Sequence, residues 1–474
     1  MYKTILKNTL FLGLIRLLNP VFSLLLIVAI TRILGGEAFG SYAFIIAITA
    51  MFGVLGQMGL QSLVIREVSK NKDLTSSYFT SAMLIGVISS TIAIILLNLA
   101  KPYFDISPEI SKLLSICSFT ILPSVLTSIV ESIFMAFEKM ELIFFEQIST
   151  SFAKILLALP LIFLGYGLTA VFIALLMTSF VSLFLSFFLY HKYLNSINFD
   201  FNFDTAFYLL KHSLTFLTIS IIFILQWRID VVMLKKLTTL IEVAMYSLAF
   251  KLFEALMIFP QVYMKSCFPQ MAILNSTNKE DFRLLSSNII RQVSFYTFAV
   301  VSVTFLLAYF PINILYGKDY SQSVTILKIL TLGLIPWSFS RAFAHILIAS
   351  NYQRLDLVAN VIATFINILL NFILIPKYGG VGAAFATLSS FSCFFIFEYL
   401  FVNQKVFKIN LFRNIGSPIA VSAILFSVIY LATVHKGVLY FELLTFLVIV
   451  IFSAFNYKVL FRFISNRIQL NSFN

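Results

Sequence analysis

Charged residues are scarce in this chain, and their scarcity excludes a water-soluble domain. Only 11% of its 474 residues are Asp, Glu, Lys or Arg, whereas a soluble domain carries about 25%. Hydrophobic residues make up 60% of the chain, and the mean hydropathy is +0.99. A chain of this composition leaves much of its apolar surface in contact with lipid. The composition therefore predicts a polytopic membrane protein.

Cysteine and histidine are also rare. The three cysteines, Cys117, Cys267 and Cys393, form an odd and scattered set, and the four histidines are equally dispersed. This pattern predicts neither a disulfide framework nor a metal site. The sequence also has no glycine-rich nucleotide loop and no convincing Ser/His/Asp set, which argues against ATP-driven transport by this chain alone.

Long apolar runs are what the sequence has in abundance. They are continuous rather than alternating, so they predict membrane-spanning helices and not a β-barrel. Each has about the 17–25 residues that a bilayer requires. The first run is too long for a signal-peptide core and lacks a small-residue cleavage site, so we expect it to be retained. The fourteen expected spans are 9–31, 41–64, 79–99, 110–135, 143–164, 168–190, 209–233, 241–264, 287–310, 322–347, 354–375, 381–402, 415–434 and 439–461.

The basic residues give these spans an orientation. An even number of spans puts both termini on one side. If that side is the cytoplasm, most of the 33 Lys and Arg residues lie in cytoplasmic segments, as the positive-inside rule requires. Topology thus accounts for the net charge of +13, and no nucleic acid is needed to explain it.

A polar segment near residues 193–208 divides the chain after six spans. A weak internal echo supports two halves: 165–175 (GYGLTAVFIAL) matches 377–387 (KYGGVGAAFAT), and each half has a tyrosine after its first span, Tyr42 and Tyr246. Six spans plus six in the same orientation predict a parallel repeat. The expected parts are an N-terminal lobe (1–200), a C-terminal lobe (201–404), and two extra helices with a cytoplasmic tail (405–474).

Five basic residues lie well inside expected spans, where a cation costs roughly 2.5–3.5 kcal/mol on insertion scales. Lys154 and Lys251 are nearest to mid-span, Arg16 and Arg341 lie in the cytoplasmic half, and Arg228 lies in the outer half. Cations at graded depths indicate a polar cavity that binds something negative. The alternative is a structural role, in which nearby acids neutralise them.

Five carboxylates share the membrane with these cations: Glu131, Glu146, Asp230, Glu254 and Glu398. Either one of these acids carries a coupling proton or sodium ion, or all of them pair with cations. Glu254 lies three residues from Lys251, on the same helical face, so these two side chains can pair. Asp230 is the better coupling candidate, because it lies two residues from Arg228 and points to a different side. Asp230 and Glu254 are the expected ion-coupling residues.

An asparagine stripe runs along the eleventh span. Asn360, Asn367 and Asn371 are spaced by seven and four residues, which places them on one helical face. The stripe either hydrogen-bonds sugar hydroxyls or ties the bundle together. Asn360 and Asn367 are therefore candidate substrate-binding residues.

Four segments resemble a known family. TRILGGEAFGSYAF (31–44) and GLQSLVIREVSK (59–70) resemble the first hairpin of Wzx-type polysaccharide and O-antigen unit flippases. These belong to the polysaccharide transporter family of the MATE-like MOP flippase superfamily. QWRIDVVMLKKL (226–237) and NILLNFILIPKYGGVGAAFATLSS (367–390) resemble that family's seventh span and its eleventh-to-twelfth junction. The resemblance covers spans one to twelve.

The resemblance implies two six-helix bundles, related by pseudo-two-fold symmetry, around a central cavity. It implies a flippase that moves undecaprenyl-diphosphate-linked oligosaccharides to the outer leaflet of the bacterial inner membrane by alternating access. The products would be O-antigen, capsule or exopolysaccharide, and the partners would be polymerase and chain-length proteins of that pathway. The resemblance implies no cofactor, but coupling to an H⁺ or Na⁺ gradient is compatible with it.

Three other functions remain open. A multidrug or cation exporter of the same superfamily should carry acids at the heart of its first lobe, but the first span carries Arg16 and no acid. A lipid II flippase stays in view because of the two extra C-terminal spans. A polysaccharide polymerase or ligase is disfavoured, because the expected outer loops are too short to hold catalytic groups.

Overall fold

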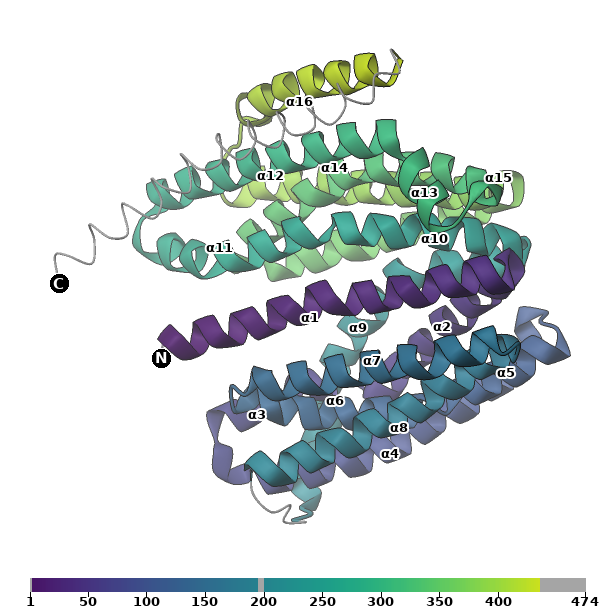
Figure 1. Ribbon diagram of the computed structural model, residues 1–474. Helices are drawn as coiled ribbons and strands as arrows, with labels where there is room; N and C mark the ends of the chain where they lie inside the picture. The colour runs from purple at the N-terminus through teal and green to yellow at the C-terminus, as the bar shows by residue number, and fades with distance from the viewer. Residues whose placement is uncertain (1, 195–199, 435–474) are drawn as a thin grey trace. The chain divides into compact units, whose positions relative to one another are not determined.

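The computed structural model describes residues 2–194 and 200–434, and every regular element within these ranges is a helix (Figure 1). In this part of the chain, 12 helical segments are long and apolar enough to cross a membrane. One of them, α15 (Gln353–Lys405), contains two of the expected spans. Thirteen expected spans therefore have helical counterparts, and the prediction of an all-α polytopic membrane protein is confirmed. The fourteenth, 439–461, lies outside the described residues.

The break inside α15 occurs at Gly379, whose φ of 55° and ψ of −133° are not helical. Such a conformation favours glycine, which has no Cβ to clash. The carboxylate of Glu242 accepts a hydrogen bond of 2.7 Å from the backbone N–H of Gly380, so the interrupted helix leaves this donor satisfied. A Cβ on Gly379 would collide with that same carboxylate. Residue 379 therefore has to be glycine for the two halves of α15 to meet in this way.

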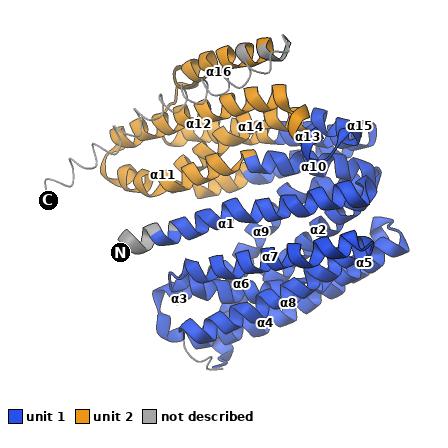
Figure 2. Cartoon of the chain, in the orientation of Figure 1, with its two compact units in different colours: residues 1–255, 312–326, 360–390 blue, residues 256–311, 327–359, 391–474 orange. Residues whose placement is uncertain are grey.

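The chain forms two compact units (Figure 2): unit 1 comprises residues 1–255, 312–326 and 360–390, and unit 2 comprises 256–311, 327–359 and 391–474. The expected lobes, 1–200 and 201–404, and their pseudo-two-fold relation stay predictions. The elements that begin in unit 1 before residue 256 are α1 (Tyr2–Ala29), η1 (Ile30–Leu34), α2 (Gly36–Gln57), α3 (Leu60–Lys70), η2 (Lys72–Leu74), α4 (Thr75–Ala100), η3 (Lys101–Phe104), α5 (Pro108–Ser118), α6 (Ile121–Ala136), α7 (Met140–Phe163), α8 (Gly167–Leu194), α9 (Phe203–Leu237) and α10 (Leu240–Leu256).

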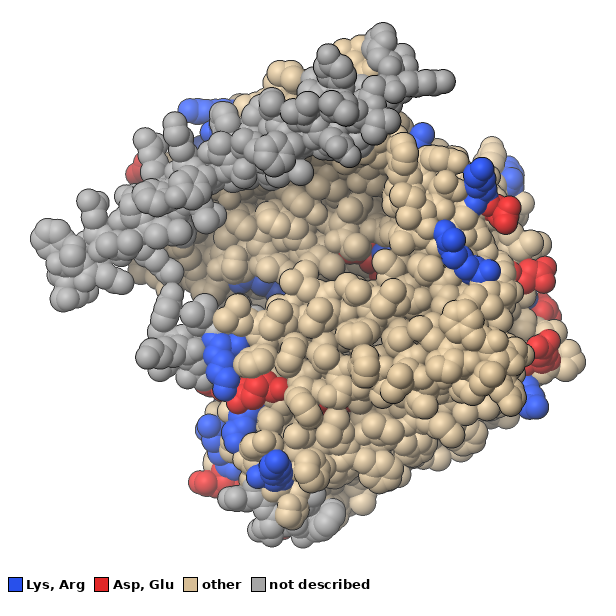
Figure 3. All heavy atoms as spheres, viewed as in Figure 1, with Lys and Arg blue, Asp and Glu red and all other residues tan. Residues whose placement is uncertain are grey.

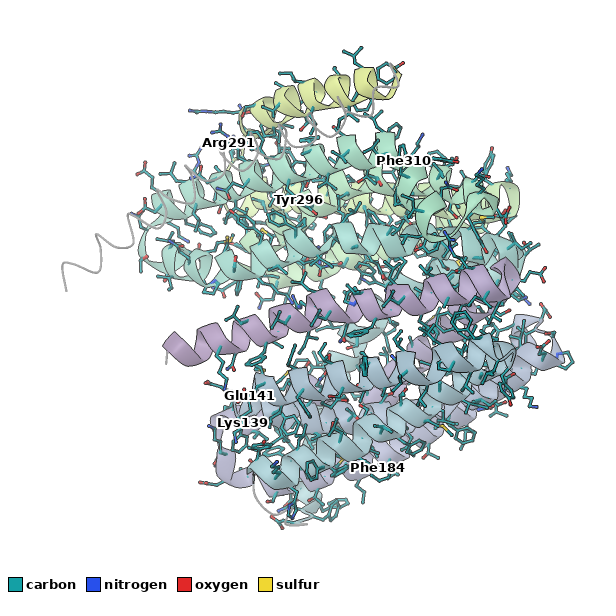
Figure 4. All side chains as sticks on the ribbon, in the orientation of Figure 1. Lys139, Glu141, Phe184, Arg291, Tyr296 and Phe310 are labelled. Carbon is teal, nitrogen blue, oxygen red and sulfur yellow. The ribbon has the colours of Figure 1, made fainter. Side chains whose placement is uncertain are left out.

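Unit 1 is held together by helices packed side by side. Helix α1 packs along α7, and α7 packs along α8. Helix α2 packs against α4 and α9, while α6 packs against α3, α4 and α8. Large apolar side chains fill the spaces between them; Phe44, Phe134 and Phe172 are each completely buried. By contrast, Phe184 of α8 is 69% exposed and points away from the helices (Figure 4), as expected of a side chain that faces lipid.

The remaining elements are α11 (Ile258–Thr277), α12 (Lys279–Leu307), α13 (Tyr309–Leu315), η4 (Lys318–Tyr320), α14 (Ser321–Ala349), α15 and α16 (Leu411–Val434). Within unit 2, α12 packs against both α11 and α16. Phe282, Phe343 and Met264 form part of its buried core. Tyr296 of α12, labelled in Figure 4, donates a hydrogen bond of 2.8 Å to the carbonyl of Leu256.

On the face shown in Figure 3, most charged side chains gather toward the two ends of the helices, and few appear on the surface between them. At the start of α7, Glu141 accepts a hydrogen bond of 2.9 Å from Lys7, and Lys139 lies beside it (Figure 4). A surface with few charges between two charged ends is the pattern that a bilayer requires.

Two helices of unit 1 approach each other closely at Gly40 of α2. A Cβ at this position would collide with the backbone carbonyl of Leu240, whereas a Cβ at Gly53 of the same helix would meet no atom within 4 Å. Because overpacking costs about 1–3 kcal/mol, Gly40→Ala should lower the melting temperature by several degrees. Gly53→Ala should leave it unchanged or raise it, since alanine favours a helix. Equal melting temperatures in thermal unfolding of the two purified variants would contradict this packing.

Candidate functional site

A cavity of about 340 Å³ in unit 1 brings together the two basic residues that lie deepest in the expected spans. Lys154 reaches it from α7 and Lys251 from α10, and α1 and α2 supply most of the remaining wall. The cavity is called the cation cavity below. Its other lining residues are Asn19, Pro20, Phe22, Ser23, Leu26, Tyr42 and Ser151.

The charges around this cavity do not cancel. Lys251 donates a hydrogen bond of 3.0 Å to Glu254, and the guanidinium of Arg228 lies 3.6 Å from the other oxygen of the same carboxylate. One carboxylate between two cations leaves one positive charge. Lys154 has no ion pair with any described residue. Lys154 and the Lys251–Arg228–Glu254 group thus carry a formal charge of +2.

A second, strongly polar cavity of about 210 Å³ shares Asn19 and Ser151 with the cation cavity. A directed chain of hydrogen bonds runs through it. Ser151 donates to Asn19 (3.0 Å), Asn19 donates to Gln147 (3.0 Å), and Gln147 donates to Glu131 (2.7 Å). The chain fixes the Asn19 amide at the wall of the cation cavity.

The buried acids Glu131 and Glu146 form no ion pair with Lys154. Glu131 accepts from Gln147, and Glu146 accepts a hydrogen bond of 2.5 Å from Ser182. The sequence allowed either acid to pair with Lys154, and in the described part of the chain neither does. The pairing expected between Lys251 and Glu254 is present.

Asp230 lies in a separate buried cluster and is only 3% exposed. It accepts hydrogen bonds from Tyr246 (2.5 Å), Thr387 (2.9 Å) and Asn371 (2.5 Å). Asn371 also donates to the side-chain oxygen of Asn367 (3.1 Å). Asp230 and Arg228 thus have different partners, as their spacing on α9 indicates. Several side-chain oxygens therefore lie close together, and such a set of ligands suits a proton or a hard cation. They belong to Asp230, Asn367, Asn371 and Thr387.

The asparagine stripe divides between environments. Asn367 and Asn371 are almost completely buried in the Asp230 cluster. This is the geometry of an interhelical polar network, the second of the two roles that the sequence allows for the stripe. Asn360, nearer the start of α15, is partly buried, and its backbone carbonyl accepts a bond from Thr364.

The remaining predicted residues do not line the cation cavity. Arg16 lies on α1 with an exposed side chain. Arg341 belongs to unit 2, where its guanidinium lies 4.6 Å from the centre of the Phe394 ring. A cation over an aromatic face in a desolvated setting is stabilised by roughly 2 kcal/mol. The role of Arg341 in substrate binding stays a prediction.

Several lining residues were not predicted from the sequence as site residues. Ser151 lies three residues before Lys154, so helical spacing already places the two on one face. Tyr42 was visible as one of the two tyrosines in the internal echo. Ser23 carried no such signal, because a single polar residue in an apolar span does not reveal which helix it faces.

Comparisons with known proteins show the family and the fold of this chain. Residues 5–275 match the family model described as polysaccharide biosynthesis protein, and residues 239–458 match that of the lipid II flippase MurJ. A solved structure of the lipid II flippase MurJ in an inward closed conformation superposes with a TM-score of 0.76 at 19% identity, covering 95% of this chain and 99% of that one. An inward-facing multidrug resistance MATE family transporter gives 0.69 at 16% identity, covering 83% and 98%.

Among curated proteins, the "probable low-salt glycan biosynthesis flippase Agl15" of Haloferax volcanii is 29% identical over 166 residues. This match covers 34% of the chain and 35% of the relative. The chain spans about a quarter to a third of the length of the curated relatives that it matches. The MurJ and MATE structures, by contrast, match over most of their length, and they show a MurJ- and MATE-like fold.

Proposed function

The chain belongs to the polysaccharide biosynthesis protein family, and from that premise we propose that it is a flippase for lipid-linked glycans. Its cargo is an undecaprenyl-diphosphate-linked oligosaccharide, carried by alternating access from the cytoplasmic to the outer leaflet of the bacterial inner membrane. The products are O-antigen, capsule or exopolysaccharide. On this proposal the chain is a transporter and not an enzyme, both termini are cytoplasmic, and polymerase and chain-length proteins act after it.

The observation that carries this proposal is the convergence of Lys154 and Lys251 on one cavity. A diphosphate has to leave water to cross the bilayer, and it needs compensating cations where the dielectric constant is low. Lys154 without an ion pair offers a full charge, and Lys251 shares Glu254 with Arg228. Lysine ammonium groups act as point charges toward phosphate, and Asn19, Ser23 and Tyr42 supply neutral hydrogen-bonding groups nearby.

We propose that Asp230 carries the coupling ion, either a proton or sodium. Its support is chemical: the carboxylate is buried, its three partners are neutral, and the side-chain oxygen of Asn371 is buried without a donor among the described residues. An unsatisfied buried acceptor beside a carboxylate fits a bound cation. Asp230, Asn367, Asn371 and Thr387 would hold the ion. Glu254 is the counter-ion of Lys251 and Arg228, and it remains the second candidate for the coupling residue.

Lipid II is the alternative cargo and carries the same kind of diphosphate. It remains a candidate because residues 239–458 match the family model of the lipid II flippase. Binding to the purified chain separates the candidates. The undecaprenyl-diphosphate oligosaccharide is expected to bind more tightly than lipid II, and both more tightly than a cationic dye such as ethidium. Tighter binding of lipid II would assign the lipid II function, and tighter binding of the dye would assign a multidrug exporter and refute the proposal.

A further inference from the structure

Unit 2 has a cavity of its own at one end of its helices. It measures about 650 Å³, within the range of about 300–1,000 Å³ that is typical of ligand sites. Three chain segments meet there: the start of α12, the turn between α14 and α15, and the end of α15. It is called the basic cavity below. Its lining residues are Lys279, Glu280, Phe282, Arg283, Ser350, Tyr352, Lys405, Val406 and Phe407.

The basic cavity carries uncompensated positive charge. Lys279, Arg283 and Lys405 line it against a single acid, Glu280, and none of these four has an ion pair with another described residue. The hydroxyl of Ser350, in the same wall, is buried without a hydrogen-bond partner in the described ranges. Lys279 donates a hydrogen bond of 2.6 Å to the side-chain oxygen of Asn275, which holds its ammonium in place without neutralising it. Three cations without an ion pair and an unused hydroxyl are the groups that bind a phosphate.

The frame of the cavity is fixed. Asn278 caps α12 by accepting hydrogen bonds from the backbone N–H groups of Glu280 (3.0 Å) and Asp281 (3.2 Å). The Phe282 and Phe407 rings pack edge to face with centroids 5.7 Å apart. The backbone at the start of α12 is therefore held in place, and part of the cavity wall between the cations is apolar.

The location of the basic cavity selects a lipid over a soluble anion. It lies where spanning helices begin and end, which is the depth of the lipid headgroups, and on the side that the charge bias makes cytoplasmic. Phe282, Val406 and Phe407 give it apolar surface beside the cations. Basic pockets of this kind between spanning helices suit anionic headgroups. We propose that the basic cavity binds the headgroup of an anionic phospholipid in the cytoplasmic leaflet.

Thermal unfolding of the purified full chain in detergent tests this proposal, because a bound lipid raises the melting temperature in proportion to its occupancy. Phosphatidylglycerol should raise it, and phosphatidylcholine and inorganic phosphate should not. In Arg283→Gln/Lys405→Gln the apparent Kd for phosphatidylglycerol should rise about thirtyfold, since each basic residue near an anionic surface contributes roughly a fivefold change. Glu280→Gln removes the one acid and should lower the Kd about fivefold.

Lys318→Gln/Lys377→Gln is the matched control, because both lysines are exposed and lie outside the basic cavity. Its Kd should equal that of the unmodified chain. An equal loss of binding in control and cavity variants would overturn the site. Equal stabilisation by phosphatidylcholine would show that the basic residues do not select an anionic headgroup. Equal stabilisation by inorganic phosphate would show that the ligand is a soluble phosphate compound and not a lipid. Since the cavity lies in unit 2, these outcomes are independent of the proposed cargo.

Discussion

Neutralising Lys154 and Lys251 together, as Lys154→Gln/Lys251→Gln, is expected to lower transport of the lipid-linked oligosaccharide at least a hundredfold. Both residues line the cation cavity, and hydrogen bonds to a charged group contribute about 1.5–3 kcal/mol each. Losing two such interactions with a diphosphate amounts to roughly two to four powers of ten. The readout is surface polysaccharide in cells, normalised to the amount of the protein in the membrane.

The single variants should differ from each other. Lys154 has no ion pair in the described part of the chain, whereas Lys251 already shares Glu254 with Arg228. Lys154→Gln is therefore expected to have the larger effect. Lys112→Gln/Lys328→Gln is the control, since both of these lysines lie near the ends of spans and outside the cation cavity. Unchanged surface polysaccharide at normal protein levels in the Lys154/Lys251 variant would remove both lysines from the site.

Asp230→Asn is expected to abolish the acceleration of transport by an imposed ion gradient while leaving substrate binding intact. The amide has the shape of the carboxylate and can still accept a hydrogen bond from Tyr246 or Thr387, but it can neither take up a proton nor neutralise sodium. Transport in proteoliposomes, with and without a proton or sodium gradient, measures the effect. We expect the gradient to give at least a tenfold acceleration in the unmodified chain and almost none in the variant.

Tyr246→Phe is the matched variant for this experiment. It removes one donor to Asp230 but leaves the carboxylate in place. It should keep its response to the gradient, because the charge that binds the ion remains. If Asp230→Asn responded to the gradient as strongly as the unmodified chain, Asp230 would have no role in coupling.

The sequence by itself determined the membrane fold and the deepest cations. A segment in lipid has to satisfy every backbone N–H and C=O internally, so a continuous apolar run of sufficient length has to become a helix. The same cost of exposing polar groups marks Lys154 and Lys251 as exceptions that need a polar environment. The pairing of Lys251 with Glu254 was also readable, because three residues separate neighbours on one helical face.

Only the tertiary structure decided which helices meet, since periodicity gives the face of a helix but not its neighbour. It turned Glu131 toward Gln147 and Glu146 toward Ser182, leaving Lys154 without either acid. It joined Asp230 to Asn371, 141 positions away in the chain. The basic cavity likewise needs three distant segments whose residues are ordinary helix ends in the sequence. Local hydrogen bonding and the bilayer set the spans, whereas packing between distant helices set the sites.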